Sequence, residues 1–179
     1  MAEHVKVKIK PLTAEAFAPY GKVLEQKKLI YPEVEEGRVA MEMLSFQYRP
    51  NARIMDQMAI HFSYNQTFIP VQGSLILVVA PPPDSREGGP EEYAFDYDNV
   101  AAFNVDPGQA AFIYKGTWHN ALTLGQECSF INVTRKNAGE GISPAGEMEG
   151  KIEQAHAVRS YVEFVDMKKR DGRVIELEV

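Results

Sequence analysis

The sequence predicts an all-β fold, a single barrel or sandwich of short strands with short helices only at its periphery. Runs of apolar and β-branched residues recur at short, even spacing, and turn residues such as Asp106-Pro107-Gly108 separate them. Leu75 to Ala80 are six consecutive apolar residues, and three prolines follow them. Such a run fits a strand that is buried on both faces, and the prolines end it.

The elements before this strand follow from local pattern. Val5 to Ile9 alternates apolar and basic residues, which indicates a half-exposed strand. Thr13 is the expected N-cap of one or two helical turns within Leu12 to Tyr20. Arg38 to Tyr48 is predicted as a long strand, although its Ala, Met, Glu and Leu residues also favour a helix. Further strands are expected at Lys22 to Gln26 and Ile54 to Phe62, and a charged loop at Lys27 to Gly37.

The stretch from His61 to Pro82 is predicted to form a hairpin at the centre of the fold. Asn65 to Ile69 is its first strand, and Ser74 to Ala80 its second, buried strand. Between them, Pro70-Val71-Gln72-Gly73 has the composition of a turn, because Pro presets φ and Gly permits positive φ.

The remaining chain continues the series of strands. We expect them at Tyr93 to Tyr97, Ala101 to Val105, Ala110 to Tyr114, Ala121 to Leu124 and Cys128 to Val133. Residues 137–150 are expected to be irregular and 151–159 to form a short helix. Tyr161 to Val179 is predicted as a hairpin with its turn at Asp171-Gly172. The whole chain, 1–179, is then one domain with a C-terminal extension from about residue 140 to 179.

Composition excludes several classes of function. The net charge of −6 argues against a nucleic-acid or anionic-membrane partner, since both require a basic surface. The single cysteine, Cys128, excludes an internal disulfide and a cysteine-based zinc cluster. No stretch is long enough to span a bilayer, and the polar N-terminus does not resemble a signal peptide. We therefore expect a cytoplasmic protein.

Two of the four histidines, His61 and His119, each border a turn and a strand. We expect them to face each other inside the barrel and to share one pocket, where Gln66 is a further polar candidate. The alternative for each histidine is a structural residue whose polar atoms are satisfied in the core. His4 and His156 are assigned no function.

The two segments that carry these histidines resemble the motifs of the cupin superfamily. His61 matches the first histidine of the first motif, Ser63 stands at the second histidine, and Gln66 replaces the glutamate that six residues separate from Gly73. In the second motif Gly116 and His119 match, whereas Tyr114 replaces Pro and Thr123 replaces Asn. The resemblance implies a cupin-like jelly-roll β-barrel whose usual metal site of three histidines and one glutamate is incomplete.

More specifically, the chain resembles the ureidoglycolate lyase family, formerly called ureidoglycolate hydrolase. The similarity begins at IKPLTAEAFAPYGKVLE and continues through Gln66 to Pro70, Gly116 to His119 and Phe130 to Arg135. The family has an acidic and a basic residue before its first histidine, where this chain has Ala59 and Ile60. The tail after residue 140 is also longer than is usual.

This resemblance implies cleavage of ureidoglycolate to glyoxylate and urea, within allantoin degradation and purine metabolism. A base must take the hydroxyl proton and an acid must protonate the leaving nitrogen, while a cation holds the carboxylate. A divalent metal, nickel or zinc, could lower the hydroxyl pKa. The expected catalytic residues are His61, His119 and Lys115; the expected substrate-binding residues are Gln66, Tyr64, Tyr114, Trp118 and Arg135; and the candidate metal ligands are His61, Gln66 and His119.

Two other classes remain open on the sequence. One is a different cupin enzyme that acts on a small hydroxy- or oxo-acid, which the changes at Ala59, Ile60 and Ser63 favour. The other is a non-catalytic cupin that binds a small ligand. The alternatives without a function in catalysis or binding are a solvated turn cation for Lys115, a surface ion pair for Arg135 and core packing for Trp118. Exposed strand edges and the family resemblance also lead us to expect a homodimer.

Overall fold

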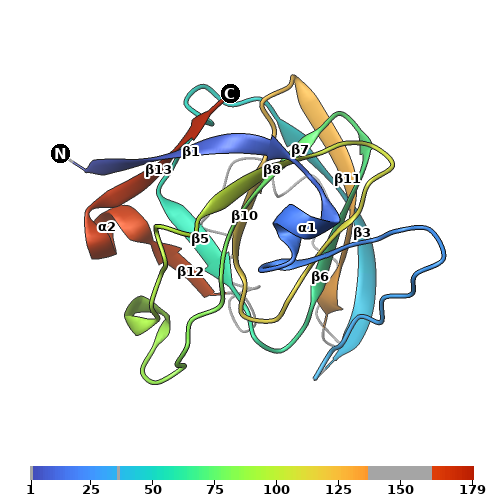
Figure 1. The fold of residues 1–179 in the computed structure, drawn as a ribbon, viewed down its shortest axis with the longest axis horizontal. Helices are drawn as coiled ribbons and strands as arrows, with labels where there is room; N and C mark the ends of the chain where they lie inside the picture. Colours follow the sequence, from blue (N-terminus) through green and yellow to red (C-terminus); the bar gives the residue numbers. More distant parts are fainter. Residues whose placement is uncertain (1, 36, 137–162) are drawn as a thin grey trace.

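The computed structural model describes residues 2–35, 37–136 and 163–179, and its regular secondary structure is almost entirely β-strand (Figure 1). The first half contains β1 (Glu3–Pro11), α1 (Ala14–Phe17), β2 (Gly21–Val23), β3 (Arg38–Gln47), β4 (Ile54–Met55), β5 (Gln57–Ile60), β6 (Gln66–Gln72) and β7 (Leu75–Ala80). The second half contains a 3-10 turn, η1 (Pro90–Glu92), β8 (Ala101–Val105), β9 (Ala111–Ile113), β10 (Trp118–Leu122), β11 (Glu127–Lys136), β12 (Glu163–Asp166), α2 (Met167–Asp171) and β13 (Arg173–Glu178). Within these residues, no helix has the length and apolar character that crossing a bilayer requires.

The strands form two sheets that enclose the barrel interior. An eight-stranded sheet has the order β12-β5-β10-β7-β8-β1-β13-β4, and a five-stranded sheet has the order β2-β9-β6-β11-β3. β4 and β5 lie at opposite ends of the strand order of the larger sheet, and only Asp56 separates them in the sequence. The two ends of this sheet are therefore close together. This curled architecture, with short peripheral helices, confirms the predicted all-β, cupin-like barrel.

The strand β7 separates two apolar cores, and all six of its residues are buried. Leu75, Leu77 and Val79 face the interior between the sheets. Ile76 and Val78 face a second core, which residues of β1, β13 and α2 complete. An unbroken apolar run is what a strand with two buried faces requires, so this prediction from the sequence is confirmed.

Most of the other predicted strands are also confirmed, as is the short helix. Thr13 caps α1 by accepting a hydrogen bond from the backbone N–H of Ala16 at 3.2 Å. Residues Arg38–Gln47 form a strand rather than a helix, because alternate side chains of β3 face the interior while the others face out. The segment predicted at Ile54 to Phe62 is divided at Asp56 into β4 and β5.

The predicted central hairpin is wrong, because β6 and β7 belong to different sheets. Pro70 is not in a turn but within β6, where it lies opposite Phe130 beside a register shift in β11. Proline is tolerated at such an irregularity because a ladder hydrogen bond is already missing. The chain crosses between the sheets at Gly73, whose φ is +66° and where a Cβ would lie 2.2 Å from the Glu127 carbonyl oxygen.

Two further predictions about strands are wrong. Tyr93 to Tyr97 is irregular, and its aromatic rings cover the second core; Phe95, for example, packs against Trp118 at 5.4 Å between centroids. The C-terminal segment is not a hairpin, because β12 pairs with β5 whereas β13 pairs with β1 and β4. Gly172 does have positive φ, +69°, but it ends the helix α2 instead of a hairpin turn. The predictions for 137–150 and 151–159 lie outside the described residues.

Candidate functional site

The structure brings His61 and His119 together, as the sequence predicted. His61 follows the end of β5, and His119 lies in β10, where it is paired with Ala59 of β5. The centroids of the two imidazole rings are 4.8 Å apart and the rings are inclined by 71°. Both side chains are buried, with 2% and 5% of their surface exposed. Residues 58 positions apart in the chain can therefore act on one small molecule.

Each ring nitrogen of His61 lies within hydrogen-bonding distance of a protein oxygen. Nδ1 lies 3.1 Å from the carbonyl oxygen of Tyr64, and Nε2 lies 2.9 Å from Oε1 of Gln66. The phenol ring of Tyr64 stacks on the imidazole with 3.8 Å between centroids. These contacts, at both ring nitrogens and on one face of the ring, hold the imidazole of His61 in one orientation.

His119 has one engaged nitrogen and one that is available. Its Nδ1–H donates to the carbonyl oxygen of Thr117 at 2.9 Å. This bond leaves Nε2 as the unprotonated nitrogen of the neutral ring. No side chain or backbone group in the described part of the chain bonds to Nε2, so it is the nitrogen of this pair that can take a proton from a ligand.

Burial keeps both imidazoles neutral. Burial lowers the pKa of His61 to about 4, against the opposing effect of its hydrogen bonds to Gln66 and Tyr64. Burial, with a further contribution from the nearby His61, lowers the pKa of His119 to about 3. At neutral pH the site therefore presents neutral rings, as a general base requires.

Gln66 and Tyr64 also lie at the histidine pair, and a residue that sequence reasoning missed supports each of them. Gln66 Nε2 donates to Oδ1 of the buried Asn132 on β11 at 2.8 Å. Tyr64 is hydrogen-bonded to Thr134, two residues further along β11, and burial raises the pKa of its phenol to about 12. Asn132 and Thr134 continue the alternate, buried positions of Cys128 and Phe130, and polar residues on such a face are the signal that could have revealed them.

Arg135 is buried next to these residues. Its Nη1 donates to the hydroxyl of Ser63 at 2.8 Å, and its positive charge acts on the phenol of Tyr64. Ser63 occupies the position at which the cupin motif has its second histidine, so a hydroxyl bound to a guanidinium replaces a possible metal ligand.

The structure does not bring Lys115, Tyr114 or Trp118 to the histidine pair. The Lys115 ammonium lies 3.0 Å from Glu33 and 3.1 Å from Glu35, and with Tyr114 it lines a surface cavity of about 420 Å³. Trp118 lies on the other face of β10 from His119 and fills the second core, where its Nε1 donates to the Ala94 carbonyl oxygen. That position is the core packing that the size of an indole favours.

The residues at the pair do not fit a divalent metal. Within the described residues, no group of three or more His, Cys, Asp or Glu side chains is placed to hold an ion. Of the candidate ligands, each nitrogen of His61 already faces a protein oxygen, at 3.1 and 2.9 Å, and the Gln66 amide oxygen is a weak ligand that lies against His61. This leaves His119 Nε2 alone, which is too few donors for nickel or zinc.

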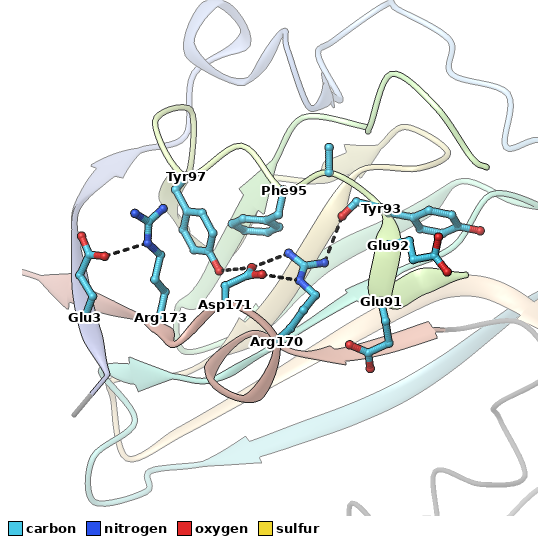
Figure 2. Close-up of a pocket in the computed structure, with 10 residues that line it drawn as sticks. Glu3, Glu91, Glu92, Tyr93, Phe95, Tyr97, Arg170, Asp171 and Arg173 are labelled. Carbon is cyan, nitrogen blue, oxygen red and sulfur yellow. Dashed lines mark hydrogen bonds and ion pairs between the residues drawn. The ribbon is translucent and has the colours of Figure 1, made fainter. Parts of the chain in front are cut away.

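A larger surface cavity of about 530 Å³ lies against α2, and Figure 2 shows its lining. Four of its charged groups form two ion pairs: Arg170 binds Asp171 through two nitrogens, at 2.8 and 2.6 Å, and Arg173 binds Glu3 at 2.9 Å. The Tyr97 hydroxyl also donates to Asp171 at 2.7 Å (Figure 2). This network attaches α2 to the segment after η1 and has a structural role.

The fold and the site define a class, the cupin-like β-barrels, here with a buried, neutral pair of histidines in the interior. Comparison with known sequences gives the particular family. The sequence model of the family described as ureidoglycolate lyase matches residues 29–149, well over half of the chain. The chain therefore belongs to the ureidoglycolate lyase family.

Individual relatives agree with this assignment. The ureidoglycolate lyase of Chelativorans sp. (strain BNC1) is 29% identical over 157 residues, which cover 76% of this chain and 89% of the relative. That of Rhodobacter capsulatus is 28% identical over 155 residues, which cover 76% and 91%. Among solved structures, a dTDP sugar isomerase from Desulfovibrio desulfuricans G20 matches with a TM-score of 0.39 and 16% identity over 66% of this chain and 68% of that chain. The fold class rests on the strand pairing described above and not on this distant likeness.

Proposed function

We propose that this protein cleaves ureidoglycolate into glyoxylate and urea, with His119 as the residue that moves the proton. The observation that carries the proposal is the state of His119: a buried, neutral imidazole, anchored through Nδ1, with Nε2 available. Membership of the ureidoglycolate lyase family supports the choice of substrate.

The reaction needs one base and one acid, and His119 can serve as both. Nε2 takes the proton of the substrate hydroxyl, the C–O electrons form the carbonyl of glyoxylate, and the C–N bond breaks toward the urea nitrogen. The imidazolium then returns the same proton to that nitrogen, and urea leaves. Because the pKa of His119 is lowered to about 3, its transient imidazolium is a strong acid, which suits protonation of a poor leaving group.

We infer that Arg135 holds the substrate carboxylate, because of where its guanidinium lies. Its guanidinium donates to Ser63 and acts on the phenol of Tyr64, the ring that stacks on His61, and a guanidinium binds carboxylates strongly. The ammonium of Lys115 already has two carboxylates, those of Glu33 and Glu35, whose combined charge opposes the approach of an anion. No step is assigned to a metal ion, because the donors at the pair do not fit one.

The test is release of urea from ureidoglycolate by the His119→Ala variant. We expect a loss of at least roughly a hundredfold, the typical contribution of a positioned acid–base group. His4→Ala, which changes an exposed side chain of β1, is the matched control and should retain full activity. Full turnover by a folded His119→Ala protein would exclude the mechanism.

One observation favours a second candidate, a lyase or isomerase of another small hydroxy- or oxo-acid. Ala59 and Ile60 replace the acidic and basic residues that the family pattern has before the first histidine, and both are buried, Ala59 opposite His119 and Ile60 in the second core. Neither position can therefore contribute a charge to the substrate. A panel of α-substituted small acids, assayed beside ureidoglycolate, separates the two candidates by their kcat/KM values.

The setting that we propose is allantoin degradation in purine metabolism, in the cytoplasm, with the protein acting as a homodimer. The outer face of the ten-residue edge strand β3 supports pairing with a second copy, since Met41 and Met43 there are 69% and 56% exposed. Light scattering should give twice the mass of the chain, and the Met41→Glu, Met43→Glu double variant should give the mass of one chain. A monomeric unmutated protein would exclude this assembly.

A further inference from the structure

A row of four polar side chains crosses the interior of the barrel and ends at His61. Asn132 Nδ2 donates to the Glu42 carboxylate at 2.9 Å, and Asn132 Oδ1 accepts from Gln66 Nε2 at 2.8 Å. Gln66 Oε1 then lies 2.9 Å from His61 Nε2. The members come from β3, β11, β6 and the residue after β5, so the row depends on the register of three strands.

The direction of every hydrogen bond in this row is set at the Glu42 end. A carboxylate only accepts, so Asn132 must turn its NH2 group toward Glu42 and its oxygen toward Gln66. Gln66 must then point its NH2 group at Asn132 and its oxygen at the imidazole. An oxygen at that place requires a proton on His61 Nε2. A carboxylate three side chains away therefore determines which ring nitrogen is protonated.

A second contact favours the opposite arrangement. On the other edge of the ring, Nδ1 lies 3.1 Å from the carbonyl oxygen of Tyr64, which also only accepts. This contact alone would place the proton on Nδ1. Burial keeps the ring of His61 neutral, with a single N–H, so two oxygens compete for one proton. The row and the Tyr64 carbonyl favour different tautomers.

We propose that Glu42 is a positioning residue of this site, which directs the two amides so that His61 keeps its proton on Nε2. Gln66 then offers the second lone pair of Oε1, an acceptor that matches the N–H groups of a urea. A reversed row would present an N–H group instead and would repel those donors. The effect on rate rests on the proposed function, whereas the effect on the imidazole can be measured without substrate.

The test is NMR of protein labelled with 15N-histidine, because the protonated and bare nitrogens of a neutral imidazole have well-separated resonances. His61→Gln identifies the signals of residue 61. In the unmutated protein near pH 7, we expect the proton on Nε2. In Glu42→Gln the side chain at 42 can donate, so the row can reverse, and we expect the proton to move to Nδ1, where Tyr64 accepts it.

Two variants make the comparison specific. Ser45→Ala removes the hydrogen bond between Ser45 and Ser129, which joins the same two strands, and should leave the tautomer unchanged. Combining Glu42→Gln with Gln66→Glu moves the carboxylate to the position next to His61. A carboxylate at position 66 accepts from Nε2 directly, so the proton should return to Nε2.

Activity gives a separate readout. Glu42→Gln should lower kcat for ureidoglycolate by on the order of tenfold or more, as expected for a wrong histidine tautomer, and Ser45→Ala should not. A proton on Nδ1 in the unmutated protein, or on Nε2 in Glu42→Gln, would overturn the proposal whatever the activity. If Glu42→Gln does not fold, the spectrum of the unmutated protein decides by itself. A tautomer that moves as expected in a protein without lyase activity would support the positioning and refute the proposed function.

Discussion

Acidification from pH 7 to pH 5 should destabilise this protein through its two buried histidines. The pKa of His61 is lowered from 6.5 to about 4 and that of His119 from 6.5 to about 3. In this interval the unfolded chain binds protons at both positions while the folded protein does not. The free energy of unfolding therefore falls as the pH falls below the unfolded value, and it continues to fall until the folded pKa values are reached.

The size of the effect follows from these values. Between pH 7 and pH 5, each histidine contributes a loss of roughly 2 kcal/mol, and the pair a loss of roughly 4 kcal/mol. A loss of about 4 kcal/mol is a large part of the roughly 5–15 kcal/mol by which domains are stable. The carboxyl pKa values of Asp96 and Asp171 are lowered, so these groups lose their stabilising effect only under more acidic conditions, outside this interval.

Urea denaturation at pH 7, 6 and 5 measures this dependence. Trp118, the single tryptophan, is fully buried and reports unfolding by its fluorescence. His119→Gln should remove about half of the pH dependence, because one of the two histidines is gone. If the unmutated protein is equally stable at pH 7 and pH 5, or if His119→Gln shows the same dependence, the two rings are not buried as neutral groups and the reasoning fails.

Two further results are expected. Gly73→Ala should lose at least about 2 kcal/mol of stability, because residue 73 has a left-handed φ and its Cβ would lie 2.2 Å from the Glu127 carbonyl oxygen. Gly108→Ala is the control: residue 108 also has positive φ but has open space around it, so this variant should lose less in the same denaturation assay. Dialysis against a chelator should leave urea release within about twofold of its starting value, because the residues at the histidine pair offer too few donors for a divalent ion; activity that disappears and returns with added nickel or zinc would contradict this.

The sequence was most informative where a local pattern had one structural solution. The apolar run of β7 predicted burial on both faces, and Thr13 predicted the start of α1. Pro70 and Gly73 were misleading because their composition also suits a turn, whereas the chain uses them to leave one sheet and enter another. Which strands pair is a non-local property that composition does not contain.

In the candidate site, too, some features could be predicted from the sequence and others could not. The positions of His61 and His119 relative to turns and strands were enough to predict that the rings meet. The contacts of Glu42 and Asn132 could not be predicted, because they depend on the register between β3, β11 and β6. Trp118 directly precedes His119 in the sequence and yet faces the other core, since neighbours on a strand point to opposite sides.

The pairing of β1 with β13 has a consequence for how the chain matures during synthesis. Residues 3–8 of β1 lie in parallel register with residues 173–178 of β13, so the two strands are neighbours although almost the whole sequence separates them (Figure 1). During translation, β1 cannot pair with β13 until β13 has left the exit tunnel of the ribosome. The growing chain therefore carries an open strand edge throughout, and it should depend on chaperones more than a protein that assembles from its N-terminus onward.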